Sequence, residues 1–160
     1  MSETKVQAPA GVPFIDVSRV FDAPRDLVYR AFTDPELLVQ WLGPQKYRMI
    51  IDTYDVRAGG SWRYLHRDAD GNEFGFHGVF HGDPSPDGIV QTFEYEGAPG
   101  HVSLDQLNLD EHDGRTTVRT HSVYQSLEAR DAVVESGMAG GMDEGFNRLD
   151  TLLDSLVPVA

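Results

Sequence analysis

The C-terminal stretch Gly137–Val157, which reads GMAGGMDEGFNRLDTLLDSLV, is the longest segment of the chain with regularly spaced apolar residues. Its large apolar side chains recur every three or four residues, which is the period of an α-helix. These side chains form one stripe, while the charged residues fall largely on the other sides. The stripe consists of Met138, Met142, Phe146, Leu149, Leu152, Leu153 and Leu156. The spacing predicts one half-buried helix, about 28 Å long at about 1.5 Å per residue.

Three glycines interrupt the first half of this predicted helix. Each glycine costs about 1 kcal/mol relative to alanine in a helix interior. At about 100° per residue, Gly145 lies in the middle of the apolar stripe, Gly141 at its edge and Gly140 outside it. Inward glycines indicate either close backbone approach or unfilled space, and a helix that begins only near Asp143 is a simpler alternative. We interpret Met138–Gly145 as a flexible, under-filled wall of a cavity.

The composition is that of a single globular domain, with 160 residues of which 40% are hydrophobic and 24% charged. The net charge of −13 disfavours nucleic acid and anionic membrane surfaces as partners. The chain has no cysteine, no signal-peptide core and no apolar run of membrane-spanning length. These features favour a cytoplasmic location. We expect residues 1–12 to form a flexible N-terminal arm and residues 13–160 to form one domain.

The rest of the chain is predicted to be mostly strand. Phe14–Phe21 alternates in polarity, and two short helices follow it, one after Asp22-Ala23-Pro24 and one at Asp34-Pro35. From there the period changes to two, and turns separate six further strands: 49–56, 61–67, 72–82, 89–96, 101–111 and 115–124. Ser126 is expected to cap a short helix before the long one. Strands joined by hairpins predict an α+β fold in which a bent antiparallel sheet grips one helix.

The hairpin around residues 69–71 has a register that can be argued from its turn. A three-residue turn with a left-handed glycine opposes Tyr64 to Phe76. It places Trp62 and His66 on the same face as that pair, so one face becomes strongly aromatic. Since the buried face determines strand register, we prefer this arrangement to a two-residue turn. The faces of the last hairpin are mixed, and its register remains open.

Several segments in a fixed order resemble the START-related superfamily often called SRPBCC: FDAP, VYRAFTDPE, QWLGP, VRAGGSWRY, DGNEF, GRTTV, HSVYQS and RDAVVESGM. The chain is similar to the branch of the heat-shock chaperone ATPase activator domain, over roughly residues 13–156. The resemblance implies a helix-grip fold, as in START and Bet v-like proteins, with an apolar cavity between sheet and helix. Superfamily members include lipid carriers, cyclases and co-chaperone domains, so the fold does not select a function.

Aromatic and methionine side chains with a few polar groups are typical of small-molecule pockets. We therefore predict that the cavity binds a small apolar or aromatic molecule, although each residue taken singly is also an ordinary core residue. His66 and His121 are the polar candidates within it. The predicted ligand-binding residues are Trp41, Trp62, Tyr64, His66, Phe76, Tyr95, His121, Met138, Met142 and Phe146.

No catalytic residue, metal site or cofactor is predicted. His77 and His81 share a strand face, but they are about 13 Å apart and cannot bind one metal ion. Metal-binding histidine motifs, the nucleophile elbow, the P-loop and the dinucleotide fingerprint are absent from the sequence. The carboxylates with the best prospect of acid–base chemistry are Asp105 and Glu94, because a carboxylate buried among aromatic rings has a raised pKa.

Two alternatives to simple binding therefore stay open. A cyclase- or hydrolase-like enzyme would need a carboxylate or histidine inside the cavity, within reach of Tyr64 or Tyr95. A chaperone-interacting module is the second alternative. Eukaryotic chaperone activators carry a separate N-terminal domain, and the short stretch of residues 1–12 disfavours chaperone binding. A homodimer is compatible with the sequence.

Overall fold

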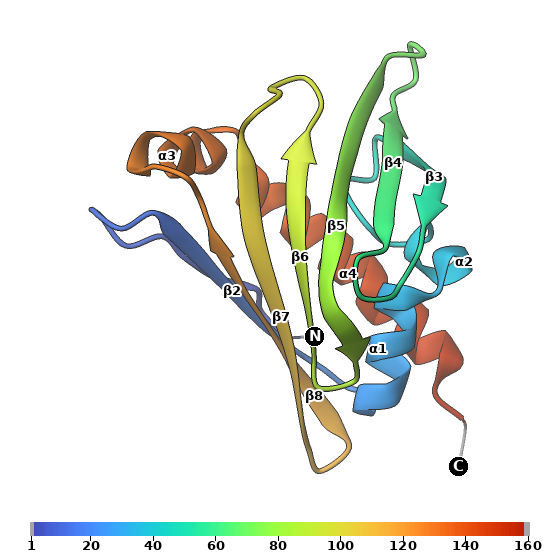
Figure 1. The fold of residues 1–160 in the computed structure, drawn as a ribbon. Coiled ribbons are helices and arrows are strands. Elements are labelled where there is room, and N and C mark those ends of the chain that lie inside the picture. The colour runs from blue at the N-terminus through green and yellow to red at the C-terminus, as the bar shows by residue number, and fades with distance from the viewer. Residues whose placement is uncertain (1, 159–160) are drawn as a thin grey trace.

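The computed structural model describes residues 2–158, and its strands form a single eight-stranded antiparallel sheet (Figure 1). The strand order is β1-β2-β8-β7-β6-β5-β4-β3. The strands are β1 (Lys5–Gln7), β2 (Phe14–Phe21), β3 (Arg48–Tyr54), β4 (Ser61–Arg67), β5 (Glu73–Ser85), β6 (Gly88–Tyr95), β7 (Val102–His112) and β8 (Arg115–Val123). The helices are α1 (Arg25–Thr33), α2 (Pro35–Leu38), α3 (Leu127–Glu135) and α4 (Met138–Leu156).

The long C-terminal helix is confirmed as the element that the sheet wraps. Figure 1 shows α4 running diagonally behind the strands. It begins directly after Gly137, whose φ of 85° is left-handed, and therefore does not begin late near Asp143. Phe146, Leu149 and Leu153 of α4 are buried against the sheet. The α+β helix-grip fold predicted from the sequence is thus confirmed.

The register of β4 against β5 is the one that the three-residue turn predicts. Tyr64 pairs with Phe76, and Trp62 pairs with Gly78. The open register of the last hairpin is settled by a two-residue turn at Asp113-Gly114, which pairs Asp105 with Ser122. We call the side of the sheet that faces α4 the inner face, and the opposite side the outer face.

The two helices after β2 differ in detail from the prediction. Pro24, rather than Asp22, is the N-cap residue of α1, and it provides no side-chain hydrogen bond. Asp34 caps α2 as expected by accepting a hydrogen bond from the Glu36 amide at 3.0 Å. Trp41 lies beyond the end of α2, in a turn, and its indole Nε1 donates to the Ala31 carbonyl at 2.9 Å. This bond fixes the loop that follows α2.

Residues 1–12 contain a strand that the sequence did not indicate. Lys5–Gln7 forms β1, which pairs with Ser18, Val17 and Asp16 of β2. Val6 and Ala8 pack against the core, but this alternation spans too few residues to predict a strand from the sequence. The backbone of β2 supplies the hydrogen-bonding partner instead, because an unpaired edge strand is a template for another strand.

Buried arginines attach the helices to the sheet. The side chain of Arg19, on the inner face of β2, is fully buried and pairs with Asp150 of α4. Arg130 of α3 donates to the Pro9 carbonyl at 2.8 Å and pairs with its neighbour Asp131 at 2.7 Å. Arg130 therefore attaches α3 to the segment that leads into β2. No helix within residues 2–158 is long and apolar enough to span a membrane.

The inward glycines of α4 provide close packing rather than the unfilled space that the sequence suggested. A Cβ added at Gly145 would lie 3.2 Å from the Trp41 carbonyl oxygen and 3.3 Å from the Gly43 nitrogen. A Cβ at Gly141 would lie 3.3 Å from the Pro44 ring. The missing side chains let α4 approach the backbone of the loop at residues 41–44. The interpretation of these glycines as an under-filled wall is therefore wrong.

Candidate ligand-binding site on the inner face

Three rings on alternate residues of β4 form a stacked ladder along the inner face. The centroid of the Trp62 ring lies 5.1 Å from that of Tyr64, and Tyr64 lies 5.3 Å from His66. The interplanar angles are 20° and 24°, so the rings are nearly parallel. This ladder follows directly from the two-residue period of a strand, which points residues i, i+2 and i+4 to one side.

Phe76 of β5 connects this ladder to the next strand. Its ring centroid lies 5.5 Å from Tyr64, 5.1 Å from His66 and 5.2 Å from Tyr95 of β6. Phe93, also on β6, lies 5.5 Å from Phe76. Offset and tilted contacts of this kind are the favoured geometries of aromatic pairs. The inner faces of β4, β5 and β6 therefore form one continuous aromatic surface.

One end of the inner face is buried and the other is partly open. Along β6 the exposed fraction rises from 5% at Ile89 to 36% at Tyr95, with Gln91 and Phe93 half-buried between them. The upper ends of β5, β6 and β8 and the start of α4 lie at the same end of the sheet in Figure 1. We call this end the open end; half-buried residues there are Phe76, Asp105, Ser122, Met138 and Met142.

A polar group, Asp105, lies within this open end. The β6–β7 and β7–β8 pairings place it between Gln91 and Ser122 on the inner face. Its Oδ1 accepts a hydrogen bond from the Ser103 hydroxyl at 3.0 Å. Burial raises the pKa of Asp105, and hydrogen bonds from the Ser122 and Ser103 hydroxyls partly offset that rise. The arrangement is a carboxylate among hydroxyls and aromatic rings.

Two ring nitrogens of the β4 ladder are buried without a hydrogen-bond partner among the described residues. They are Nε1 of Trp62 and Nε2 of His66. Trp62 is 2% exposed and His66 is 7% exposed. Burial, and secondarily the charge of Arg148, lowers the pKa of His66 to about 4, so the imidazole is neutral at pH 7. Buried polar atoms without a partner are uncommon and costly in folded proteins.

The structure brings most of the predicted ligand-binding residues onto the inner face, but it divides them between the two ends. Trp41 and Phe146 lie in the closed part, where their rings stack at 6.2 Å and both are nearly fully buried. Met138 and Met142 line the N-terminal half of α4 and are half-buried. The remaining inner-face members are the ladder residues, Phe76 and Tyr95.

His121 is the predicted residue that does not join this group. It lies on the outer face, where its Nδ1 is 2.5 Å from Asp16 Oδ1 and its ring packs on Phe14. Its strand neighbours Thr120 and Ser122 point inward instead. The sequence could not assign these faces because the register of β7 and β8 was open.

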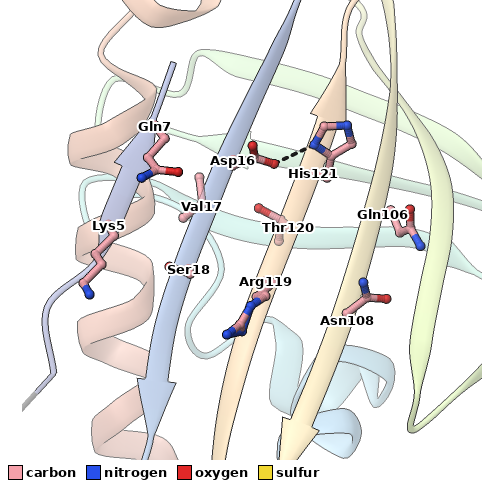
Figure 2. Close-up of a pocket in the computed structure, with 10 residues that line it drawn as sticks. All are labelled: Lys5, Gln7, Asp16, Val17, Ser18, Gln106, Asn108, Arg119, Thr120 and His121. Carbon is pink, nitrogen blue, oxygen red and sulfur yellow. Dashed lines mark hydrogen bonds and ion pairs between the residues drawn. The ribbon is translucent and has the colours of Figure 1, made fainter. Parts of the chain in front are cut away.

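A hollow of about 320 Å³ lies on the outer face, over β1, β2, β8 and β7 (Figure 2). The side chains that point into it are polar or charged, and Figure 2 shows the His121–Asp16 contact at its upper edge. Its charged lining residues are Lys5, Arg119 and Asp16. This hollow is therefore distinct from the aromatic surface on the inner face.

An antiparallel sheet wrapped on a single C-terminal helix is the architecture of helix-grip proteins. Residues 22–154 match the family described as Activator of Hsp90 ATPase homolog 1-like protein. The match covers most of the chain, which therefore belongs to this family. No curated protein matches the chain.

Solved structures from bacteria share this fold. A protein from Rhodobacter sphaeroides is 27% identical, with a TM-score of 0.88, over 96% of this chain and 99% of its own. Protein Ms6760 from Mycobacterium smegmatis is 23% identical, with a TM-score of 0.85, over 94% and 97%. CalU16 from Micromonospora echinospora is 22% identical, with a TM-score of 0.61, over 96% and 86%. The last two likenesses concern the fold alone.

Proposed function

We propose that the protein binds a small apolar or aromatic molecule at the open end of the inner face. The observation that carries this proposal is the gradient of exposure along β6, from 5% at Ile89 to 36% at Tyr95. A face covered by α4 along its whole length would be buried throughout. Here the aromatic surface continues to a point where solvent reaches it, which is the condition for a ligand to enter.

The composition of the open end supports the same function. Met138 and Met142 have flexible side chains that adapt their packing to what lies against them. Phe76 and Tyr95 present ring surface, with their ring centroids 5.2 Å apart. A ligand with an aromatic or apolar body would pack against both.

The experiment is a comparison of two equally exposed residues on opposite faces. Tyr95 and Val79 are both 36% exposed, but Tyr95 lies on the inner face and Val79 on the outer face. We expect native mass spectrometry of the freshly purified protein to show a carried small molecule, and Tyr95→Ala to reduce its occupancy. Val79→Ala should retain it. Equal retention in both variants, or no aromatic compound that raises the Tm, contradicts the proposal.

A cyclase- or hydrolase-like activity in the same site is the second candidate. Asp105 favours it, because such a reaction needs a carboxylate on the inner face and burial raises the pKa of this one. Hydrolysis of a chromogenic aromatic ester tests it, with Asp105→Asn compared with Asp154→Asn on the exposed side of α4. Activity that depends on Asp105 alone supports an enzyme. An absence of turnover, or equal turnover in both variants, argues against a reaction there.

A further inference from the structure

Asp105 is a charged group on the inner face at the open end, and its neighbours within the sheet are neutral. Its strand partners are Gln91 and Ser122, and its carboxylate accepts hydrogen bonds from the hydroxyls of Ser103 and Ser122. No lysine, arginine or histidine contributes to its pKa. Carboxylates removed from water are normally paired with a cation or several donors. Asp105 has donors but no counter-ion among the described residues.

The arginines that extend toward the helix side are engaged elsewhere. Arg19 pairs with Asp150. Arg148 donates to the carbonyl oxygens of Gly43 and Gln40, at 3.2 and 2.9 Å. Since guanidinium groups held by several hydrogen bonds are costly to release, they are poor counter-ions for Asp105. A cation for this carboxylate would have to come from outside the chain.

Two tyrosines lie close enough to Asp105 for its charge to act on them. The charge of Asp105 acts on the phenol groups of Tyr64 and Tyr124 and, after burial, is among the causes that raise their pKa values, in Tyr124 to about 12. Phe76 and Phe93 continue the aromatic surface from Tyr64. The faces of aromatic rings attract cations, and this attraction increases when water is excluded.

We propose that the ligand of the open end is an organic cation, an amine or ammonium group carried on an aromatic or apolar body, with Asp105 as its counter-ion. This inference rests on the proposed binding function and adds the chemical class of the ligand. A charge-assisted hydrogen bond from the ammonium group to the carboxylate is roughly twice as strong as a neutral one. The net charge of −13 also draws cations toward the protein.

The outer-face hollow is a second place where an amine could bind, and it differs from the open end in its charges. Lys5 and Arg119 line it, and its lining carboxylate, Asp16, is already paired with His121 (Figure 2). An amine bound by this protein is therefore expected at Asp105 and not in that hollow. Substituting Asp105 then tests the location of binding as well as its chemistry.

The experiment uses two ligands of nearly equal shape, 2-phenylethylamine and 2-phenylethanol, with isothermal titration calorimetry and thermal shift. We expect the wild-type protein to bind the amine at least about tenfold more tightly than the alcohol. Asp105→Asn should lose this preference, because it keeps the size and the acceptor oxygen but removes the charge. Asp154→Asn, which removes one exposed carboxylate from α4, should keep the preference.

Each outcome has a distinct meaning. Equal binding of amine and alcohol to the wild-type protein overturns the cation inference and leaves the proposed binding function standing. Binding of neither compound counts against both. An amine preference that persists in Asp105→Asn overturns the assignment of Asp105. The wild-type comparison is independent of any variant, so it remains decisive even if Asp105→Asn folds poorly.

Discussion

Replacing Gly145 with leucine tests whether α4 is closely packed against the loop at residues 41–44 or leaves space there. Even a single Cβ at Gly145 would lie 3.2 Å from the Trp41 carbonyl oxygen and 3.3 Å from the Gly43 nitrogen. Both atoms belong to backbone that cannot easily retreat. Trp41 is 1% exposed, and Arg148 holds the Gly43 carbonyl at 3.2 Å.

The matched control is Gly140, in the same helix, where a Cβ would meet no atom within 4 Å. Gly140→Ala should raise the free energy of unfolding by up to about 1 kcal/mol through helix propensity alone. Gly145→Ala has the same gain but must also displace backbone, so we expect its stability to lie about 1 kcal/mol below that of Gly140→Ala. Gly145→Leu should lose about 1–3 kcal/mol relative to wild type.

Thermal and urea unfolding followed by circular dichroism measure these differences. For a chain of this size, about 1 kcal/mol corresponds to roughly 2–4 °C in Tm. We therefore expect Gly145→Leu to lower the Tm by about 2–12 °C. A Gly145→Leu protein with wild-type Tm and weakened ligand binding would refute close packing and restore the under-filled wall.

Three further predictions concern charged and titratable groups. Asp150→Ala should destabilise the protein by about 3–5 kcal/mol in urea unfolding, because it leaves the buried Arg19 guanidinium without its main partner; a loss below about 1 kcal/mol would contradict this. His66 has a folded pKa of about 4 against 6.5 for the free side chain, so the unfolded chain binds more protons between these values and stability falls as pH is lowered from 6.5 to 4. At about 1.36 kcal/mol per pKa unit, the free energy of unfolding falls by roughly 3 kcal/mol over this range. Urea unfolding measured at several pH values should show this fall in the wild type and not in His66→Phe. The contribution of Asp105 to the pH dependence of stability has the opposite sign. Its folded pKa is raised from 3.8, so the native state binds more protons than the unfolded chain. Stability therefore falls as the pH rises from 3.8 through the folded pKa. Asp105→Asn should remove that fall and be at least as stable as wild type at pH 7; marked destabilisation would instead make Asp105 a structural residue.

The features that the sequence predicts well are those set by short-range pattern and turn chemistry. The seven-residue apolar stripe of α4 has a helix period over its whole length, and the helix forms as expected. The glycine at residue 71 permits the left-handed turn that aligns Tyr64 with Phe76, and the ladder of Trp62, Tyr64 and His66 follows from that register. Such signals are local, so no distant contact is needed to interpret them.

Other features depend on segments that lie far apart in the chain. β1 forms because β2 offers an unpaired edge, although Lys5–Gln7 is too short for its own pattern to predict a strand. Gly145 faces the loop at residues 41–44, about a hundred residues earlier, and nothing near it in sequence distinguishes close packing from empty space.

The assignment of faces shows the same division. Which way Asp105 and His121 point depends on the β7–β8 register, and a slip of one residue would exchange the two faces. The sequence by itself therefore determined the long helix, the hairpins and the aromatic residues of the sheet that wraps the helix. Tertiary structure alone decided that Asp105 faces inward and His121 outward, because the face of a residue in a mixed strand is set by its pairing partner rather than by its own neighbours.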